Sequence, residues 1–313
     1  MRQRMTRTLG AVALLLGATG AMAQGEAPSG DPSGTPSADE ARFLAANVEW
    51  VLDHEMAHAL IHEFDLPVLG QEEDAADSFA SASVSARHPE REAAERLALV
   101  AELWFLEAEA VGEPDYFTEH DLDIQRGFRV LCVANGADSA VADAALAFVD
   151  VPDGGFDGCE VDRDLATESW DVLIGPNTLY EDEPPADVTV EYGPAEGLEA
   201  ERAALEATGA MEALAAEAAE TYALFDPLLI AGRACGEPDA FHDADEGEIV
   251  LCYELVADML ALRAAADEAA DDGADEAADD AQAEDVQAED VKVEDVRAGD
   301  PRADGGDDDG TAR

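Results

Sequence analysis

Mutual repulsion between acidic side chains is the feature that most constrains how this chain can fold. Its 313 residues include 74 Asp and Glu against 17 Lys and Arg, which gives a formal net charge of −57 at pH 7. A surface with this charge repels nucleic acid and anionic membranes, and it destabilises a compact state unless salt or bound cations screen it. We therefore expect no nucleic-acid partner, and a melting temperature that rises with salt.

Both ends of the chain lack the composition of a folded domain. Residues 1–23 begin with arginines, continue through an apolar run and end in Ala-Met-Ala, the pattern of a secretory signal peptide cleaved after Ala23. Residues 24–36 are a flexible linker rich in Gly, Pro and Ser, and residues 265–313 are an acidic low-complexity tail that we expect to be disordered. This leaves one domain over residues 37–264, in a mature protein that is periplasmic or secreted without stable membrane insertion.

The four cysteines indicate two disulfides, because the signal peptide directs the chain to an oxidising compartment. Three pairings are possible. We favour the bonds between sequence neighbours, Cys132–Cys159 and Cys235–Cys252, since each closes a short local loop. None of the four forms a C-x-x-C pair, which disfavours a thiolate zinc site.

The apolar periodicity of the central region is mainly helical. Ser37 and Glu40 form a capping-box signature, and the helical pattern that follows should end near Asp65, before Pro67. Further helices are predicted over residues 71–86, 89–110, 122–136 and 166–176, with one long alanine-rich helix within 197–225. A strand is predicted at 187–192, and residues 235–260 predict a hairpin, with its second strand from Glu248 to Tyr253, and then a helix. The fold class is therefore α+β and mainly helical.

Within the first predicted helix, His54, Glu55 and His58 form an H-E-x-x-H pattern. Residues four apart lie on one face of a helix, so both imidazoles can be directed at one cation. Glu55 lies beside them, where it can take a proton from a zinc-bound water. His62 continues the spacing, but it lies about 12 Å along the axis from His54, which is too far for one ion to bind both.

A catalytic zinc needs a third protein ligand and an open position for water. The extended motif with Gly at 61 and His at 64 is excluded, because this chain has Ile61 and Phe64 there. The turn at 66–70 returns the chain towards the first helix and brings an acidic cluster with it. The candidates for the third ligand are Glu72, Glu73, Asp74 and Asp77.

The stretch "HEMAHALIHEFDLPVLGQEEDAAD", residues 54–77, resembles the gluzincin-like zincins, whose third ligand is a glutamate on a following helix in the pattern E-x-x-x-D. It is also similar to a family of secreted bacterial proteins assigned as zinc metallopeptidases of undefined substrate, with a resemblance that covers about residues 40 to 260. The resemblance implies that Glu73 is the third ligand, with Glu72 in reserve. It also implies that Asp77 holds a ligating histidine from behind.

Several other residues have a structural reading beside a functional one. His120 is a candidate to donate a hydrogen bond to the oxyanion, as a distal histidine does in some zincins, or else it is a surface residue near a helix N-terminus. Arg126 is expected to pair with a structural carboxylate. Tyr253 and the three tryptophans are expected to pack in the core. Zincins usually place a sheet before the zinc helix, so here the sheet has to come from downstream, with Glu248 to Tyr253 as the candidate edge strand.

These patterns predict a zinc-dependent metallopeptidase that hydrolyses peptide or protein substrates, with Zn²⁺ held by His54, His58 and Glu73. Glu55 would activate the water and then protonate the leaving amine. One alternative is a non-catalytic metal-binding envelope protein, whose site a fourth protein ligand closes. Another is an acidic scaffold that binds cationic partners through its tail. The sequence indicates neither the cleavage preference nor the oligomeric state.

Overall fold

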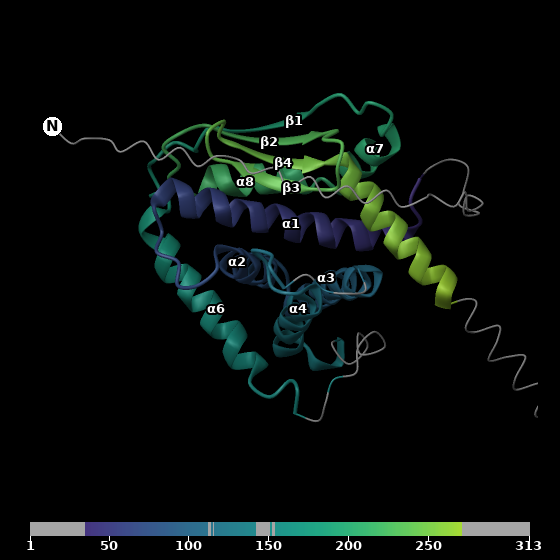
Figure 1. The fold of residues 1–313 in the computed structure, drawn as a ribbon. Helices are drawn as coiled ribbons and strands as arrows, with labels where there is room; N and C mark the ends of the chain where they lie inside the picture. The colour runs from purple at the N-terminus through teal and green to yellow at the C-terminus, as the bar shows by residue number, and fades with distance from the viewer. Residues whose placement is uncertain (1–34, 112–113, 115, 142–150, 152–153, 271–313) are drawn as a thin grey trace, which may run out of the picture. The chain divides into compact units, whose positions relative to one another are not determined.

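The long helix α1 (Ala38–Phe64) lies between a small sheet and a group of helices, as Figure 1 shows for the computed structural model. The structure describes residues 35–111, 114, 116–141, 151 and 154–270. The predicted capping box at Ser37 and Glu40 is confirmed, and the helix ends at Asp65, which adopts a left-handed conformation with φ of 50°. Because α1 is buried along most of its length, polar side chains in its middle are held away from bulk solvent.

The predicted helices are confirmed except in one region, although the helix predicted at 166–176 begins earlier, at Cys159. They are α2 (Glu72–Arg87), α3 (Glu90–Val111), α4 (Asp123–Ala137) and α6 (Cys159–Ile174), followed by the short η1 (Gly175–Asn177) and, after the sheet, by a helix over residues 253–270. Both predicted disulfides are confirmed. Cys132–Cys159 ties α4 to the start of α6, and Cys235–Cys252 closes the hairpin region.

The single long helix predicted within residues 197–225 is wrong. The structure has two helices there, α7 (Glu199–Thr208) and α8 (Ala210–Thr221), separated at Gly209. Gly209 has a φ of +65°, a left-handed conformation that glycine adopts without steric cost and that ends a helix. The alanine-rich composition on both sides hid this break.

The sheet has the strand order β1-β2-β4-β3. Its strands are β1 (Val188–Tyr192), β2 (Leu228–Arg233), β3 (Ala240–Asp243) and β4 (Glu248–Cys252). β2 pairs in parallel with both β1 and β4, while β3 and β4 form the predicted antiparallel hairpin. The expectation that Glu248 to Tyr253 is the edge strand is wrong, because the unpredicted strand β2 occupies the other side of β4. The edge strands are β1 and β3, and β3 packs beside α1 (Figure 1).

Two apolar clusters fix α1 from opposite sides. Phe43, Leu52 and Met56 pack towards the sheet and α8, while Trp50 packs with α2, α3 and α4. As expected, Tyr253 is fully buried, and its hydroxyl donates to the backbone carbonyls of Gly193 and Gly232. The rotation of α1 is therefore set by packing, and its His54 and His58 side chains face α2.

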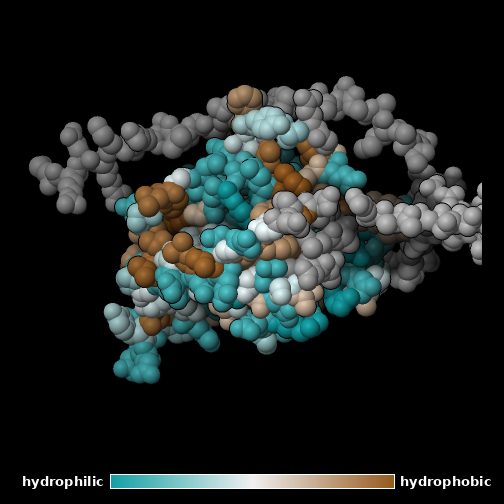
Figure 2. Space-filling view, turned by 90° about the horizontal axis from the view of Figure 1, so that it is seen from below, coloured by the Kyte–Doolittle hydropathy of each residue, from teal (hydrophilic) through white to brown (hydrophobic). Residues whose placement is uncertain are grey.

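The molecular face in Figure 2 is hydrophilic over much of its area, with apolar side chains gathered on one side. Exposed apolar residues include Leu69, Leu165 and Val172, which line a groove between the turn before α2 and helix α6. Among the described helices, none has the length and apolarity needed to cross a membrane. The predicted signal peptide, nearly all of the predicted linker, and residues 271–313 of the predicted tail lie outside the described residues.

Candidate metal centre

Two histidines of α1 direct the same ring nitrogen towards one point. His54 and His58 lie one turn apart, and their Nε2 atoms are 3.2 Å from each other. His54 is 5% exposed and Glu55 is 6% exposed, so both belong to the interior at this level of the helix. Helical spacing alone produces this pair, as the sequence predicted.

Helix α2 supplies the carboxylate that completes the group. The turn before it passes through Gly70, whose φ of +120° suits glycine, and α2 then packs against α1. Glu73 Oε2 lies 3.1 Å from His54 Nε2 and 3.3 Å from His58 Nε2. The three atoms thus form a nearly equilateral triangle with sides of 3.1 to 3.3 Å.

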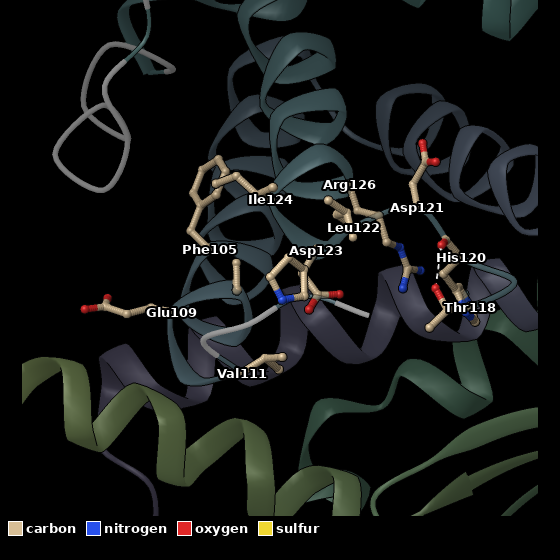
Figure 3. Close-up of a pocket in the computed structure, with 12 residues that line it drawn as sticks. Phe105, Glu109, Val111, Thr118, His120, Asp121, Leu122, Asp123, Ile124 and Arg126 are labelled. Atoms are coloured by element: carbon tan, nitrogen blue, oxygen red, sulfur yellow. Dashed lines mark hydrogen bonds between the residues drawn. The ribbon is translucent and has the colours of Figure 1, made fainter. Parts of the chain in front are cut away.

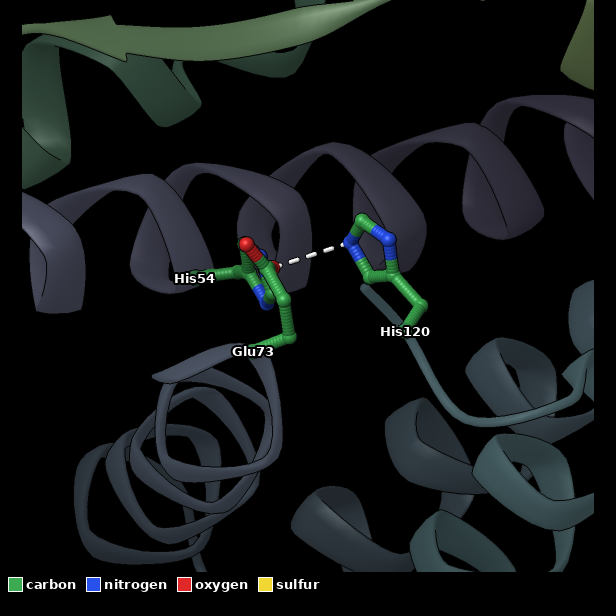
Figure 4. A group of neighbouring side chains, drawn as sticks. All are labelled: His54, Glu73 and His120. Atoms are coloured by element: carbon green, nitrogen blue, oxygen red, sulfur yellow. Dashed lines mark hydrogen bonds and ion pairs between the residues drawn. The ribbon is translucent and has the colours of Figure 1, made fainter. Parts of the chain in front are cut away.

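His120, on the loop before α4, approaches the same carboxylate from the other side (Figure 4). Its Nε2 lies 2.9 Å from Glu73 Oε2, and its ring is nearly parallel to that of His54. Ligand atoms of His54, Glu73 and His120 all lie within 4.8 Å of one another. The structure therefore brings together His54, His58, Glu73 and His120, while Glu72 lies at the outer nitrogen of His58 and the other candidate, Asp74, pairs with Arg129.

The outer nitrogens of both histidines are bonded to carboxylates. His54 Nδ1 is 2.9 Å from Asp77 Oδ1, and His58 Nδ1 is 2.8 Å from Glu72 Oε1. A carboxylate accepts a hydrogen bond from Nδ1–H, so that in the neutral imidazole the lone pair lies on Nε2. Two ring nitrogens and a carboxylate oxygen converge at about 3 Å, so positive charge is needed among them. Protons on the histidines can supply it, since burial would lower the pKa of His58 but the hydrogen bonds to Glu73 and Glu72 raise it to about 9, and a bound cation can take their place. These residues therefore fit a metal cation.

Asp77 is itself held in place by Arg126. The Arg126 guanidinium donates two hydrogen bonds of 2.8 Å to the two oxygens of Asp77, and it stacks on Trp104 at 3.7 Å from the ring centre. The expectation that Arg126 pairs with a structural carboxylate is confirmed. Burial would raise the pKa of Asp77, but the hydrogen bonds from His54 and Arg126 lower it to about 2. Asp77 is thus a fixed anion behind His54.

The pKa values of the two glutamates of the centre, Glu55 and Glu73, are shifted in opposite directions. Burial raises the pKa of Glu55, against the opposing charges of His54 and His58. For Glu73 burial also acts upwards, but the hydrogen bonds from His120, His54 and His58 hold its pKa far below the usual range. Among the described residues Glu55 makes no side-chain hydrogen bond or ion pair. Glu73 is therefore suited to remain an anion, and Glu55 to exchange a proton.

Asp239, at the start of β3, is a member of this neighbourhood that sequence reasoning missed. Its charge acts on Glu55, and the charge of His120 acts on it in turn. No spacing pattern marks Asp239, because it reaches the centre only through the hairpin. His62, set aside on the sequence, lies instead near His242 of β3, with ring centres 6.0 Å apart.

A family model with the description "Putative metallopeptidase" matches residues 24–174 and 193–287, which is most of the chain. No curated protein and no solved structure matches it.

Proposed function

We propose that this chain, which belongs to the family described as "Putative metallopeptidase", is a zinc-dependent peptidase that acts outside the cytoplasm. The observation that carries the proposal is the triangle of His54 Nε2, His58 Nε2 and Glu73 Oε2 beside a buried Glu55. Zinc bound tetrahedrally at about 2.0–2.1 Å separates its ligand atoms by about 3.3 Å, which is close to the sides of this triangle. We assign these three residues as the ligands.

Zinc bound there would polarise the scissile carbonyl and lower the pKa of a water molecule. Glu55 would take the proton of the attacking water and pass it to the leaving amine, a role that suits a buried carboxylate with a raised pKa. Asp77 and Glu72 would keep the two imidazoles in the tautomer that binds metal. His120 would donate a hydrogen bond to the oxyanion.

Edge strand β3 supports a peptide substrate, because it lies beside α1 and no strand of the described residues pairs with its outer edge, onto which an extended peptide can add as a strand. The two disulfides support an oxidising compartment. The proposal accordingly includes removal of residues 1–23, a catalytic domain at 37–264 and an appended acidic tail.

One observation favours a second function. Because His120 Nε2 lies 2.9 Å from Glu73 Oε2, His120 can also serve as a fourth ligand. A centre closed by four protein ligands is structural, and the chain would then be a non-catalytic metal-binding protein.

The test measures zinc per chain by mass spectrometry and hydrolysis of casein on the same samples. Wild type should hold one zinc and cleave casein, His58→Ala should lose the zinc, and Glu55→Gln should keep it without activity. Glu199→Gln, the same change at an exposed position of α7, is the control. If His120→Ala keeps zinc and loses activity, His120 serves the reaction. Loss of zinc in His120→Ala, with an inactive wild type, would establish the structural alternative, and an absence of zinc from reconstituted wild type would overturn both.

A further inference from the structure

A cavity of about 590 Å³ lies beside the candidate metal centre. Its wall includes His120, which contacts Glu73, and Arg126, which holds Asp77. This volume is within the range of small-molecule pockets and holds any amino-acid side chain. In Figure 3, Phe105 and Ile124 lie at one end of the cavity and His120 at the other, so the cavity leads away from the centre.

The lining combines apolar and charged side chains in similar numbers. Phe105, Val111 and Ile124 contribute apolar surface, and Val111 and Ile124 are themselves 57% and 43% exposed. Apolar side chains left open in a hollow next to a reactive centre gain free energy when a hydrocarbon chain covers them. The cavity therefore suits a side chain with a long aliphatic stem.

The charged groups of the cavity do not balance. Arg126 is committed to Asp77, and Asp121 pairs with Arg129 at 2.6 Å. Asp123, half-buried at the start of α4, and Glu109, at the rim, have no hydrogen-bond or ion-pair partner among the described residues. Burial raises the pKa of nearby Glu107 to about 7, and the charges of Asp258 and Asp123 act in the same direction against that of Arg126, so Asp123 lies in an acidic neighbourhood. A cation at the end of the bound stem would meet these carboxylates.

We propose that this cavity is a substrate subsite that selects a basic side chain, lysine or arginine, next to the bond to be cleaved. The inference rests on the proposed peptidase function and assigns its substrate class. Asp123 is the specificity-determining residue, Phe105, Val111 and Ile124 hold the aliphatic stem, and Glu109 attracts the cation at the rim.

The experiment uses quenched fluorescent peptides in which each position around the scissile bond carries in turn Lys or norleucine, which has a comparable unbranched stem without the charge. At one position, zinc-loaded wild type should cleave the Lys peptide with a kcat/KM about tenfold higher than the norleucine peptide. In Asp123→Asn this ratio should fall to about one. In Asp182→Asn, the same charge change at an exposed residue before β1, it should be kept. Equal rates for the two peptides in wild type, or a preference that survives Asp123→Asn, would overturn the inference while leaving the peptidase in place.

A binding measurement separates failure of this inference from failure of the proposed function. Fluorescence anisotropy with the zinc-loaded Glu55→Gln protein should show tighter binding of the Lys peptide, and the preference should vanish in Glu55→Gln/Asp123→Asn. If wild type cleaves no peptide, the proposed function fails, and this binding preference alone decides the subsite. If Asp123→Asn does not fold, Ile124→Trp replaces it, because the larger side chain fills the cavity. This variant should weaken binding of the Lys peptide but not binding of an Ala peptide. An equal loss of binding for both peptides would count against the subsite.

Discussion

Helix α1 carries two buried polar clusters that differ in how their charges are paired. On one face Asp53 accepts two hydrogen bonds from Arg87, which also contacts Glu49 and Glu217, while Arg96 contacts Glu49 as well. On the other face, one residue further along, His54, His58 and Glu73 converge with no arginine among them. The first cluster pairs its carboxylates with arginines, whereas the second, among the described residues, sets only imidazoles against Glu73 and can accept a cation.

The difference is informative because basic residues are scarce in this chain, at 17 against 74 acidic ones. Where an arginine is paired with buried carboxylates, as at Arg87, the cluster holds helices together. Where imidazoles alone face a carboxylate, the cluster has the composition of a metal site. Arg126 is an intermediate case. It pairs with Asp77, which bonds the outer nitrogen of His54, but it does not itself contact the converging nitrogens.

The largest expected effect comes from breaking the cluster in which Arg87 contacts Asp53, Glu49 and Glu217. Arg87→Met removes the partner of Asp53, whose side chain is 2% exposed, and should lower the free energy of unfolding by about 3–5 kcal/mol. Arg87→Met with Asp53→Leu should recover most of this loss, because no buried charge is left unpaired. Urea unfolding checks both variants. A loss below about 1 kcal/mol in Arg87→Met would mean that the cluster is not structural.

The cluster of His54, His58 and Glu73 should stabilise the protein further only when a metal is supplied. Zinc at a free concentration a hundredfold above its dissociation constant should stabilise wild type by about 2.7 kcal/mol, measured by urea unfolding. His58→Ala should show no gain. His62→Ala is the matched control, because His62 continues the helical spacing outside the triangle and should keep the full gain. An equal gain in all three proteins would place the binding site elsewhere.

The residue behind His54 should have a smaller effect. Asp77→Asn removes the fixed anion that holds His54 Nδ1, and should weaken zinc binding about 10- to 100-fold in a chelator competition. Asp74→Asn, one turn earlier on α2 and paired with Arg129 at the surface, serves as the control. Unchanged zinc affinity in Asp77→Asn would show that packing alone positions His54.

Local features of the sequence predicted most of the helices and the candidate site. His54 and His58 share a helix, Glu73 lies on the next one, and each disulfide closes a short loop, so few long-range facts were needed. The features that the sequence did not predict depend on residues that are far apart in the chain. Strand β2, "LLIAGR", is a short run whose parallel pairing joins segments far apart in the chain, and its presence turned β4 into an inner strand. The Arg126–Asp77 and Arg87–Asp53 bonds span 49 and 34 residues, and no pattern selects those partners among so many acids.

The smallest expected effect concerns an acid that neither cluster neutralises. Burial and the charges of Asp258 and Asp123 raise the pKa of Glu107 to about 7 from an ordinary 4.5. The native state therefore binds this proton more tightly than the unfolded chain does, so the stability it contributes is present below about pH 4.5 and is lost as the pH rises through 7. Because Glu107 is only half-buried, Glu107→Gln should be more stable than wild type at pH 8 by about 1 kcal/mol. At pH 5 the two should be nearly equal. Urea unfolding at both pH values checks this, with Glu199→Gln as the exposed control. A difference that does not change with pH would mean that the pKa of Glu107 is not raised in the folded protein.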